Sequence, residues 1–233
     1  MRDAEAGVAV TATTRDRRGF LGSHVGDVSK MSLKTIIFDF GNVVAFFDHS
    51  RALRQLLGYT ELSFEELWRI LYGSRLEDLY ERGRITTREF VRDARREARL
   101  TCSEATFLAA YVDIFWGNDE VHAIIPRLKP RYRLLLASNT NAAHFERFTR
   151  QFAEILGQFD RLCPSHHCGF RKPEAEYFAD CQEHAAAKPS ECLFIDDLAE
   201  NVEAAQRHGW QGICYQQPGT LAEKLQSAGV QFD

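Results

Sequence analysis

Short apolar segments recur along the chain, and most of them end at a polar residue. They lie at residues 35–38, 133–137, 159–163, 191–195 and 211–215. The first is rich in β-branched residues and stops abruptly at Asp39. Continuous runs of this length are typical of strands that are buried on both faces of a parallel sheet. The pattern therefore predicts parallel strands at these positions, and it is weakest at 159–163.

Amphipathic segments lie between these runs, at residues 142–152, 174–186 and 201–208. Gly209 follows the last segment, and glycine commonly ends a helix. Strands that alternate with helices favour a parallel sheet with helices on both faces, because each crossover packs a helix onto the sheet. We therefore predict an α/β fold with a Rossmann-like, doubly wound parallel sheet.

The alternation is interrupted between residues 45 and 118, where only helical patterns occur. Two capping boxes, Ser63 with Glu66 and Thr86 with Glu89, each precede an amphipathic segment. These patterns predict an all-helical insertion of about 70 residues directly after the first strand, a size within the range of small domains.

The chain is thus predicted to have three parts. They are a flexible N-terminal extension at residues 1–32, a catalytic core at 33–45 and 119–233, and a helical cap at 46–118. The extension is predicted because its glycine, serine, threonine, aspartate and arginine residues show no apolar periodicity. Pro126 lies inside the apolar stretch 121–128 and argues against a straight helix there.

The charge balance and the cysteines limit the partners and the compartment. The chain has 29 basic and 33 acidic residues, a formal net charge of −4 and no long basic stripe, which argues against nucleic acid as a partner. No apolar run reaches the roughly 18 residues that a membrane-spanning helix needs. Six cysteines at irregular spacing, with no secretory signal, indicate free thiols in a reducing compartment. We therefore expect a cytoplasmic protein with no membrane partner.

Polar side chains follow the predicted strands at the edge where a doubly wound sheet collects its ligands. They are Asp39 after the first strand, Ser138 and Asn139 after the strand at 133–137, and Asp196 and Asp197 after the strand at 191–195. Lys172 lies in a loop and is followed by Pro173, which favours the start of a helix. We expect these side chains to converge on one point.

The converging charges indicate a metal and an anionic substrate. Three carboxylates at one point repel one another, and Mg²⁺, which prefers a few carboxylates and water, suits the gap between them. The ion and Lys172 would shield Asp39 from a phosphate, whose oxygens Ser138 and the following backbone N–H groups can bind. We predict that Asp39 attacks the phosphate as a nucleophile and forms an aspartyl-phosphate, which water then hydrolyses.

In their order and their places at strand ends, these residues resemble the four motifs of the haloacid dehalogenase superfamily. The matching segments are Asp39-Phe40-Gly41-Asn42, Ser138-Asn139-Thr140-Asn141, Gly169-Phe170-Arg171-Lys172-Pro173, and Asp196-Asp197 followed by Asn201. In detail they look like the bacterial group that includes α-D-glucose-1-phosphate phosphatase. The resemblance implies a type-1 helical cap over the substrate, dependence on Mg²⁺, and small phosphomonoesters such as sugar phosphates as substrates.

The resemblance also implies a role for each residue. The expected catalytic residues are Asp39, Lys172 and Ser138, the expected substrate contacts are Ser138, Asn139, Lys172 and Asn42, and the expected metal ligands are Asp39, Asp196, Asp197 and the backbone carbonyl of Gly41. Asn201 is expected either to support a metal-bound water or to occupy only the first turn of a helix.

Gly41 departs from the pattern of most phosphatases in this superfamily. They carry a second aspartate two residues after the nucleophile, which acts as general acid and base. The glucose-1-phosphate phosphatase-like group shares the glycine, so activity is not excluded. Asn42 cannot titrate and could only orient a water, so His49, near the cap entrance, and a substrate-bound water are the candidate replacements.

Two other functions stay open. A 2-haloacid dehalogenase would use Asp39 to form an alkyl ester without a metal, but the pair Asp196-Asp197 argues against it. A catalytically silent relative that binds a phosphorylated ligand or a protein is compatible with Gly41. The sequence does not distinguish a monomer from a homodimer.

Several further groups have two interpretations. The segment 163–168 holds two cysteines and two histidines, but ligands this close together rarely complete a zinc tetrahedron. The segment 80–83 either touches the substrate or only bends the chain. Four aromatic residues are expected to fill the core of the cap: Trp68, Trp116, Phe107 and Phe115.

Overall fold

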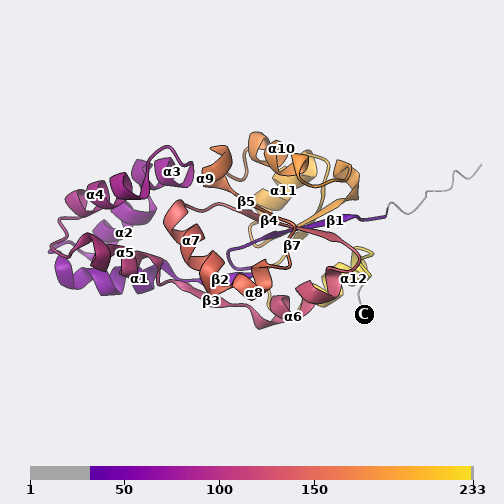
Figure 1. The fold of residues 1–233 in the computed structure, drawn as a ribbon, viewed down its shortest axis with the longest axis horizontal. Coiled ribbons are helices and arrows are strands. Elements are labelled where there is room, and N and C mark those ends of the chain that lie inside the picture. Colours follow the sequence, from indigo (N-terminus) through magenta and orange to yellow (C-terminus); the bar gives the residue numbers. More distant parts are fainter. Residues whose placement is uncertain (1–31, 232–233) are drawn as a thin grey trace, which may run out of the picture. The chain divides into compact units, whose positions relative to one another are not determined.

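A five-stranded parallel sheet forms the centre of the chain in the computed structural model, which describes residues 32–231 (Figure 1). Its strands are β1 (Thr35–Asp39), β4 (Arg133–Ser138), β5 (Arg161–Pro164), β6 (Cys192–Asp196) and β7 (Gln211–Cys214). Their order across the sheet is β5-β4-β1-β6-β7, with β1 in the middle. All five predicted strands are present and every neighbouring pair is parallel, so the predicted α/β fold is confirmed.

Successive side chains of the central strand enter different hydrophobic clusters. Ile36 and Phe38 of β1 belong to one cluster, and Ile37 belongs to the other. The first cluster contains helices α6 (Asp119–Leu128), α7 (Ala142–Gln151), α8 (Ala153–Leu156) and α12 (Leu221–Ser227). The second contains α10 (Ala175–Glu183) and α11 (Ala199–Arg207). Because strand side chains alternate between faces and both faces are covered, the central residues of the strands are apolar.

Five helices fill most of the segment between β1 and α6. They are α1 (His49–Leu56), α2 (Phe64–Tyr72), α3 (Arg75–Glu81), α4 (Thr87–Glu97) and α5 (Glu104–Val112), with a 3-10 turn η1 (Leu57–Tyr59) after α1. Their apolar faces form a third cluster, which includes Leu53, Leu67 and Phe90. Both predicted capping boxes are present, at the starts of α2 and α4. The exact division into core and cap stays a prediction.

The insertion is not all-helical, which corrects the expectation that residues 45–118 contain only helices. Strand β2 (Ala45–Phe47) leads into the helices, strand β3 (Phe115–Gly117) leads out of them, and the two pair antiparallel. Each strand has three residues, which is too short to show an alternating pattern in the sequence. The helices are therefore joined to the sheet through a two-stranded ribbon.

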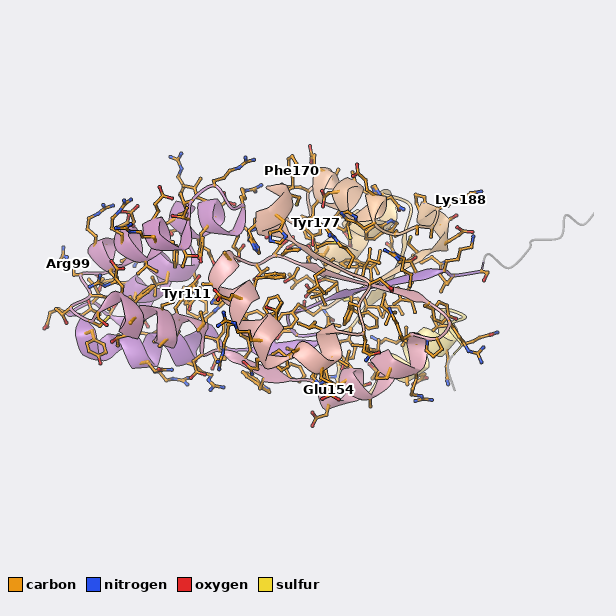
Figure 2. All side chains as sticks on the ribbon, viewed as in Figure 1. Arg99, Tyr111, Glu154, Phe170, Tyr177 and Lys188 are labelled. Atoms are coloured by element: carbon orange, nitrogen blue, oxygen red, sulfur yellow. The ribbon has the colours of Figure 1, made fainter. Side chains whose placement is uncertain are left out.

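The expected aromatic core of the cap is only partly correct. Phe107 is fully buried among the helices, but Phe115 packs against the cluster of the sheet. Trp68 and Trp116 are 39% and 43% exposed, so they do not fill a core. Trp68 lies one position beyond the buried Leu67, and a helix turns by about 100° per residue, which carries it away from the apolar face. Tyr111 of α5 fills the interior instead (Figure 2).

Two further predictions concern helix α6 and the N-terminal extension. Helix α6 runs from Asp119 to Leu128 with Pro126 inside it. The predicted flexible extension falls almost entirely at residues 1–31, outside the described residues. Among residues 32–231, every helix is too short or too polar to cross a membrane.

Candidate functional site

Three neighbouring strands bring the predicted catalytic residues to one edge of the sheet. The register pairs Asp39 at the end of β1 with Ala137 of β4, so Ser138 is the next residue. On the other side, Asp196 ends β6, which is also paired with β1. Asp39, Ser138 and Asp196 are 7%, 4% and 0% exposed. The parallel topology therefore places two carboxylates and a hydroxyl together, and all three residues are buried.

Lys172 joins two of these carboxylates. Its Nζ lies 2.6 Å from Oδ1 of Asp39, 2.7 Å from Oδ2 of Asp196 and 3.2 Å from the carbonyl oxygen of Ala137. Asn139 holds the backbone of the lysine: its Oδ1 accepts from the N–H of Lys172 at 2.8 Å, and its Nδ2 donates to the carbonyl oxygen at 2.9 Å. The loop of Lys172 is therefore docked against the end of β4.

Burial and charge act in opposite directions on the ion pair. Burial disfavours the charged form of Lys172, but Asp39 and Asp196 outweigh it and raise the pKa of the amine well above its usual range. Burial raises the pKa of Asp39 to about 8, with Lys172 opposing the shift and Asp196 adding to it. The positive charge of one ammonium group therefore does not balance the negative charges of the two carboxylates beside it.

Asp196 is oriented by donors from its own loop. The N–H of Leu198 donates to Oδ1 at 2.9 Å, and the side chain of Asn201 donates to Oδ1 and Oδ2 at 3.0 and 3.1 Å. Together with Lys172, these donors occupy both oxygens. Asn201 is buried in α11 and therefore does more than occupy a helix turn, because it fixes the carboxylate of Asp196.

Asp197 lies at the more open side of the site. The side-chain amide of Asn42, whose backbone is left-handed with φ of 57°, donates to Oδ2 of Asp197 at 3.0 Å. Burial raises the pKa of Asp197, and this hydrogen bond opposes the shift. A cavity of about 410 Å³ opens beside these two residues and is lined also by Phe46, Leu198 and Tyr215. Asn42 thus contacts a predicted metal ligand.

The three aspartates fit a divalent cation. Asp39, Asp196 and Asp197 each offer an oxygen, and these oxygens lie within 4.8 Å of one another. Within residues 32–231, no other group of three or more histidine, cysteine, aspartate or glutamate side chains is this close. Hard carboxylate oxygens suit Mg²⁺, and its two positive charges would balance the excess negative charge. The backbone carbonyl of Gly41 stays a predicted additional ligand.

The structure refines the predicted substrate contacts. Ser138 and Lys172 lie next to Asp39, as a phosphate contact requires. The side chain of Asn139, however, uses both ends of its amide on the backbone of Lys172. The backbone N–H of Asn139 therefore stays the predicted phosphate donor, and its side chain has a positioning role that the sequence did not suggest.

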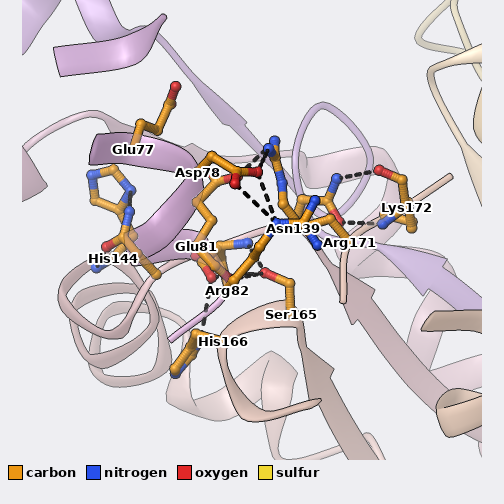
Figure 3. A network of polar contacts seen from close by, with 12 residues as sticks. Glu77, Asp78, Glu81, Arg82, Asn139, His144, Ser165, His166, Arg171 and Lys172 are labelled. Carbon is orange, nitrogen blue, oxygen red and sulfur yellow. Dashed lines mark hydrogen bonds and ion pairs between the residues drawn. The ribbon is translucent and has the colours of Figure 1, made fainter. Parts of the chain in front are cut away.

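A second set of charges lies between the helical insertion and the lysine loop (Figure 3). Arg82, after α3, donates to Asp78 at 2.9 Å and to Glu174 at 2.9 Å. Arg171, next to the catalytic lysine, reaches back to Asp78 at 3.1 Å and to Glu81 at 2.7 Å. No pattern in the sequence indicates this network, because Arg82 and Glu174 are 92 positions apart and no motif links them.

The segment 80–83 contacts the core, which supports the interpretation that it bends the chain; a contact with the substrate stays a prediction. The hydroxyl of Tyr80 accepts from the N–H of Ala143 at 3.0 Å, and the carbonyl oxygen of Glu81 accepts from Ser165 of α9 (Ser165–Cys168) at 2.7 Å. Gly83 has φ of 62°, and a Cβ there would lie 2.2 Å from the carbonyl oxygen of His166. A glycine is required at this close approach.

His49 lies in an aromatic group rather than in a set of polar residues. Its ring stacks on Tyr72 at 3.9 Å between centroids and packs on Phe47 at 4.9 Å. Burial lowers the pKa of His49 to about 4, so the imidazole is neutral at pH 7. A neutral ring is a weak general acid, and His49 as the replacement for the missing aspartate stays a prediction. Unchanged turnover in a His49→Ala variant would exclude it.

The residues of the segment 163–168 have separate partners. Cys163 is buried in the cluster under the sheet, and the thiol of Cys168 contacts the carbonyl oxygens of Ser165 and Phe170. His166 contacts the carbonyl oxygen of Thr140 at 3.2 Å. All six cysteines are free, as the sequence predicts.

A comparison with protein families identifies the fold and the site together. The model of the haloacid dehalogenase-like hydrolase family matches residues 33–209, a range that includes Asp39, Ser138, Lys172, Asp196 and Asp197. The chain belongs to this family. The predicted superfamily is therefore confirmed, and the chain is a hydrolase of the haloacid dehalogenase type.

Individual relatives of this hydrolase differ in how much of their sequence aligns with it. Flavin mononucleotide hydrolase 1 from Arabidopsis thaliana is 36% identical over 62 residues, which is 27% of this chain and only 25% of that protein. D-ribitol-5-phosphate phosphatase from Bacteroides thetaiotaomicron is 23% identical over 188 residues, 77% of this chain and 90% of that protein. The chain thus spans about a quarter of the first relative and most of the second.

A solved structure supports the fold of this hydrolase independently. A HAD family enzyme from Bacteroides thetaiotaomicron, crystallised in complex with magnesium and inorganic phosphate, superimposes with a TM-score of 0.71 at 23% identity. The match covers 81% of this chain and 96% of that chain. At this identity the similarity establishes the shared fold.

Proposed function

We propose that this hydrolase is a Mg²⁺-dependent phosphatase that acts on small phosphomonoesters through an aspartyl-phosphate on Asp39. One observation carries the proposal: the buried Lys172 bridges Asp39 and Asp196, while Asp197 completes a set of three carboxylates close enough to share one ion. A phosphate dianion brings further negative charge, and only a site with added positive charge can accept it.

Each side chain has a distinct task in this proposal. Bound Mg²⁺ would supply the positive charge that neutralises the phosphate oxygens and holds them in line with the nucleophile. Lys172 binds the phosphate and favours the ionised form of Asp39, which the bound ion would favour further, and Ser138 donates a hydrogen bond to a phosphate oxygen. Asp39 attacks the phosphorus atom, and water later cleaves the resulting acyl phosphate.

The relatives support the same chemistry. The relative from Bacteroides thetaiotaomicron is a D-ribitol-5-phosphate phosphatase, and the structural neighbour binds magnesium and inorganic phosphate. We extend this to the present chain as a preference for phosphorylated sugars or similar small metabolites. The predictions of a cytoplasmic location, of no nucleic-acid or membrane partner, and of a monomer or homodimer stand beside this proposal.

The test is release of inorganic phosphate from a panel of phosphorylated metabolites, with and without Mg²⁺. We expect turnover that requires the metal and disappears in an Asp39→Asn variant. Halide release from 2-haloacids without metal would indicate the dehalogenase reaction instead. An absence of turnover in both assays would indicate a silent relative.

A further inference from the structure

The residue two positions after the nucleophile faces a space that an aromatic ring occupies. A Cβ built on Gly41 would lie 3.7 Å from Oδ2 of Asp39, so a side chain at this position would point into the reaction site. The same Cβ would lie 2.7 Å from Cε1 and 3.3 Å from Cδ1 of Phe47. Phe47 therefore fills the position in which a general acid at residue 41 would sit.

Phe47 is held there by the backbone and by its neighbours. A turn folds the chain back after β1, with the N–H of Asn42 donating to the carbonyl oxygen of Ala45 at 2.8 Å. Phe47 then pairs with Phe115 in the ribbon, and its ring packs on His49. The turn and the ribbon fix the backbone of Phe47, and a movement of its ring away from Gly41 would break the packing on His49.

Two of the nearby polar side chains are bound elsewhere, and the buried Nδ1 of His49 has no hydrogen-bond partner among residues 32–231. Lys172 is bound to two carboxylates, and Asp197 accepts from Asn42 at the metal side of the site. His49 packs its ring on Tyr72 and Phe47 and is neutral at pH 7 because burial lowers its pKa to about 4. The space beside Asp39 in which related phosphatases have a carboxyl group thus holds an aromatic ring.

We propose that no side chain among the described residues of this site, His49 included, provides a proton to the leaving group, and that the site therefore selects phosphomonoesters whose leaving oxygen is already acidic. Aryl, enol and acyl phosphates belong to this class. Among sugar phosphates, those that carry the phosphate on a more acidic hydroxyl are preferred over those that carry it on a primary alcohol. The inference deepens the proposed phosphatase function and rests on it.

The two steps balance without an acid or a base from the protein. In the first, a carboxylate oxygen of Asp39 bonds to phosphorus while the bond to the leaving oxygen breaks; that oxygen keeps the electron pair and takes a proton from water. In the second, water attacks the same phosphorus atom, Asp39 is released as a carboxylate, and the proton of the water passes to the phosphate. The second step also lacks a general base, so it is slow and the phosphorylated protein accumulates.

The first experiment measures kcat/KM of the Mg²⁺-loaded protein on aryl phosphates of decreasing phenol acidity. We expect a fall of about 10²- to 10⁴-fold from a nitrophenol to phenol, the size of the contribution that a positioned acid supplies. We also expect a burst of released phenol equal to the protein concentration. The kcat that follows should be the same for all the aryl phosphates, because hydrolysis of the phosphorylated protein limits it. A flat series without a burst would overturn the inference, whereas no turnover of any aryl or acyl phosphate would overturn the phosphatase function itself.

The second experiment restores the acid. In a Gly41→Asp/Phe47→Ala double variant the carboxyl group has room, and we expect the dependence on leaving-group acidity to flatten. Phe47→Ala alone is the matched control and should keep the steep dependence. If the dependence on leaving-group acidity is as steep in the double variant as in this control, a carboxyl group at residue 41 does not supply the proton and the inference fails.

Glu77 of α3 is, like Glu81 of the same helix, a largely buried acid on the insertion, and it provides a third variant. We expect Glu77→Gln to leave the dependence on leaving-group acidity unchanged. If wild-type protein showed a flat series that became steep in Glu77→Gln, Glu77 would be the missing acid and the inference would be wrong. These series need only folded protein, which thermal unfolding followed by circular dichroism verifies.

Discussion

Two clusters of acidic and basic side chains meet at the loop of Lys172, and they differ in burial. In the catalytic cluster the side chains of Lys172, Asp39 and Asp196 are 2%, 10% and 0% exposed. In the network between the insertion and the core, Arg82 and Glu174 are 24% and 34% exposed. The same kinds of charges therefore have different energetic consequences on the two sides of one loop.

Water explains this difference. A buried charge that loses its partner is destabilising, because nothing replaces the lost interaction. A partly exposed pair is screened, and each partner can be hydrated when the other is removed. The catalytic cluster thus holds buried charges beside the nucleophile. The network contacts the helices of the insertion through partly exposed pairs, whose loss should change stability little.

The largest expected effect is on turnover in the catalytic cluster. Asp39→Asn removes the nucleophile, and we expect kcat to fall by at least about 10⁴-fold, as loss of a nucleophile commonly does. Stability should not fall in parallel, because the variant also removes one of three mutually repelling carboxylates. Steady-state kinetics and urea unfolding check both parts, with Asp113→Asn as a surface control. A variant that retains a tenth of the activity would contradict the proposed nucleophile.

Loss of the buried cation should be the largest effect on stability. Lys172→Met leaves Asp39 and Asp196 buried without their ammonium partner, and we expect the free energy of unfolding to fall by about 3–5 kcal/mol. Mg²⁺ should recover part of the loss in the variant, because the ion supplies positive charge to the same oxygens. Urea unfolding with and without Mg²⁺ measures this. No recovery would argue against a metal at these aspartates.

Glu77 lies beside Glu81 and Arg171 of the network, and it allows the pH dependence of stability to be tested there. Burial raises its pKa from an ordinary value of 4.5 to about 8, so the folded protein holds a proton that the unfolded chain releases. This contribution to stability is present below pH 4.5 and is lost as the pH rises towards 8. Glu77→Gln should remove this loss, so its free energy of unfolding should change less between pH 5 and pH 8 than that of wild type. The exposed Glu65→Gln is the control, and equal pH dependence in all three proteins would refute the shift.

The smallest effect is expected within the network. Arg82→Ala and Glu174→Ala should each lower stability modestly, and a double-mutant cycle should give a coupling of about 0.2–1 kcal/mol that weakens at high salt. Arg92→Ala, which breaks an exposed pair with Asp93 on α4, is the matched control. A salt-independent coupling of about 3–5 kcal/mol, the size of the loss expected for Lys172→Met, would remove the distinction between the two regions.

Much of the catalytic site could be predicted because its position depends on topology. Asp39, Ser138 and Asp196 each end a parallel strand, and once the alternation of strands and helices is recognised, their convergence follows. Lys172 was found through its order relative to those motifs. The role of Asn139 was not found, because a side-chain amide that binds the lysine backbone leaves no trace in the spacing of residues.

Other features depended on contacts between distant segments. The exposure of Trp68 and Trp116 follows from which face of a helix or strand meets the core. The ring of Phe47 over Gly41 follows from a turn and a ribbon of three-residue strands. Neither a local pattern nor a motif carries this information.

The sequence by itself determined the class of fold, the family and the chemistry at the strand ends, since strand and helix periodicity and the order of polar strand ends are properties of local segments. Tertiary structure decided what surrounds that chemistry: the pairing of Arg82 with Glu174, the clamp of Asn139 on Lys172, and the aromatic ring in place of an acid. The physical reason is that burial and proximity, which set the strength of a charge or the space for a side chain, arise only when remote segments pack together.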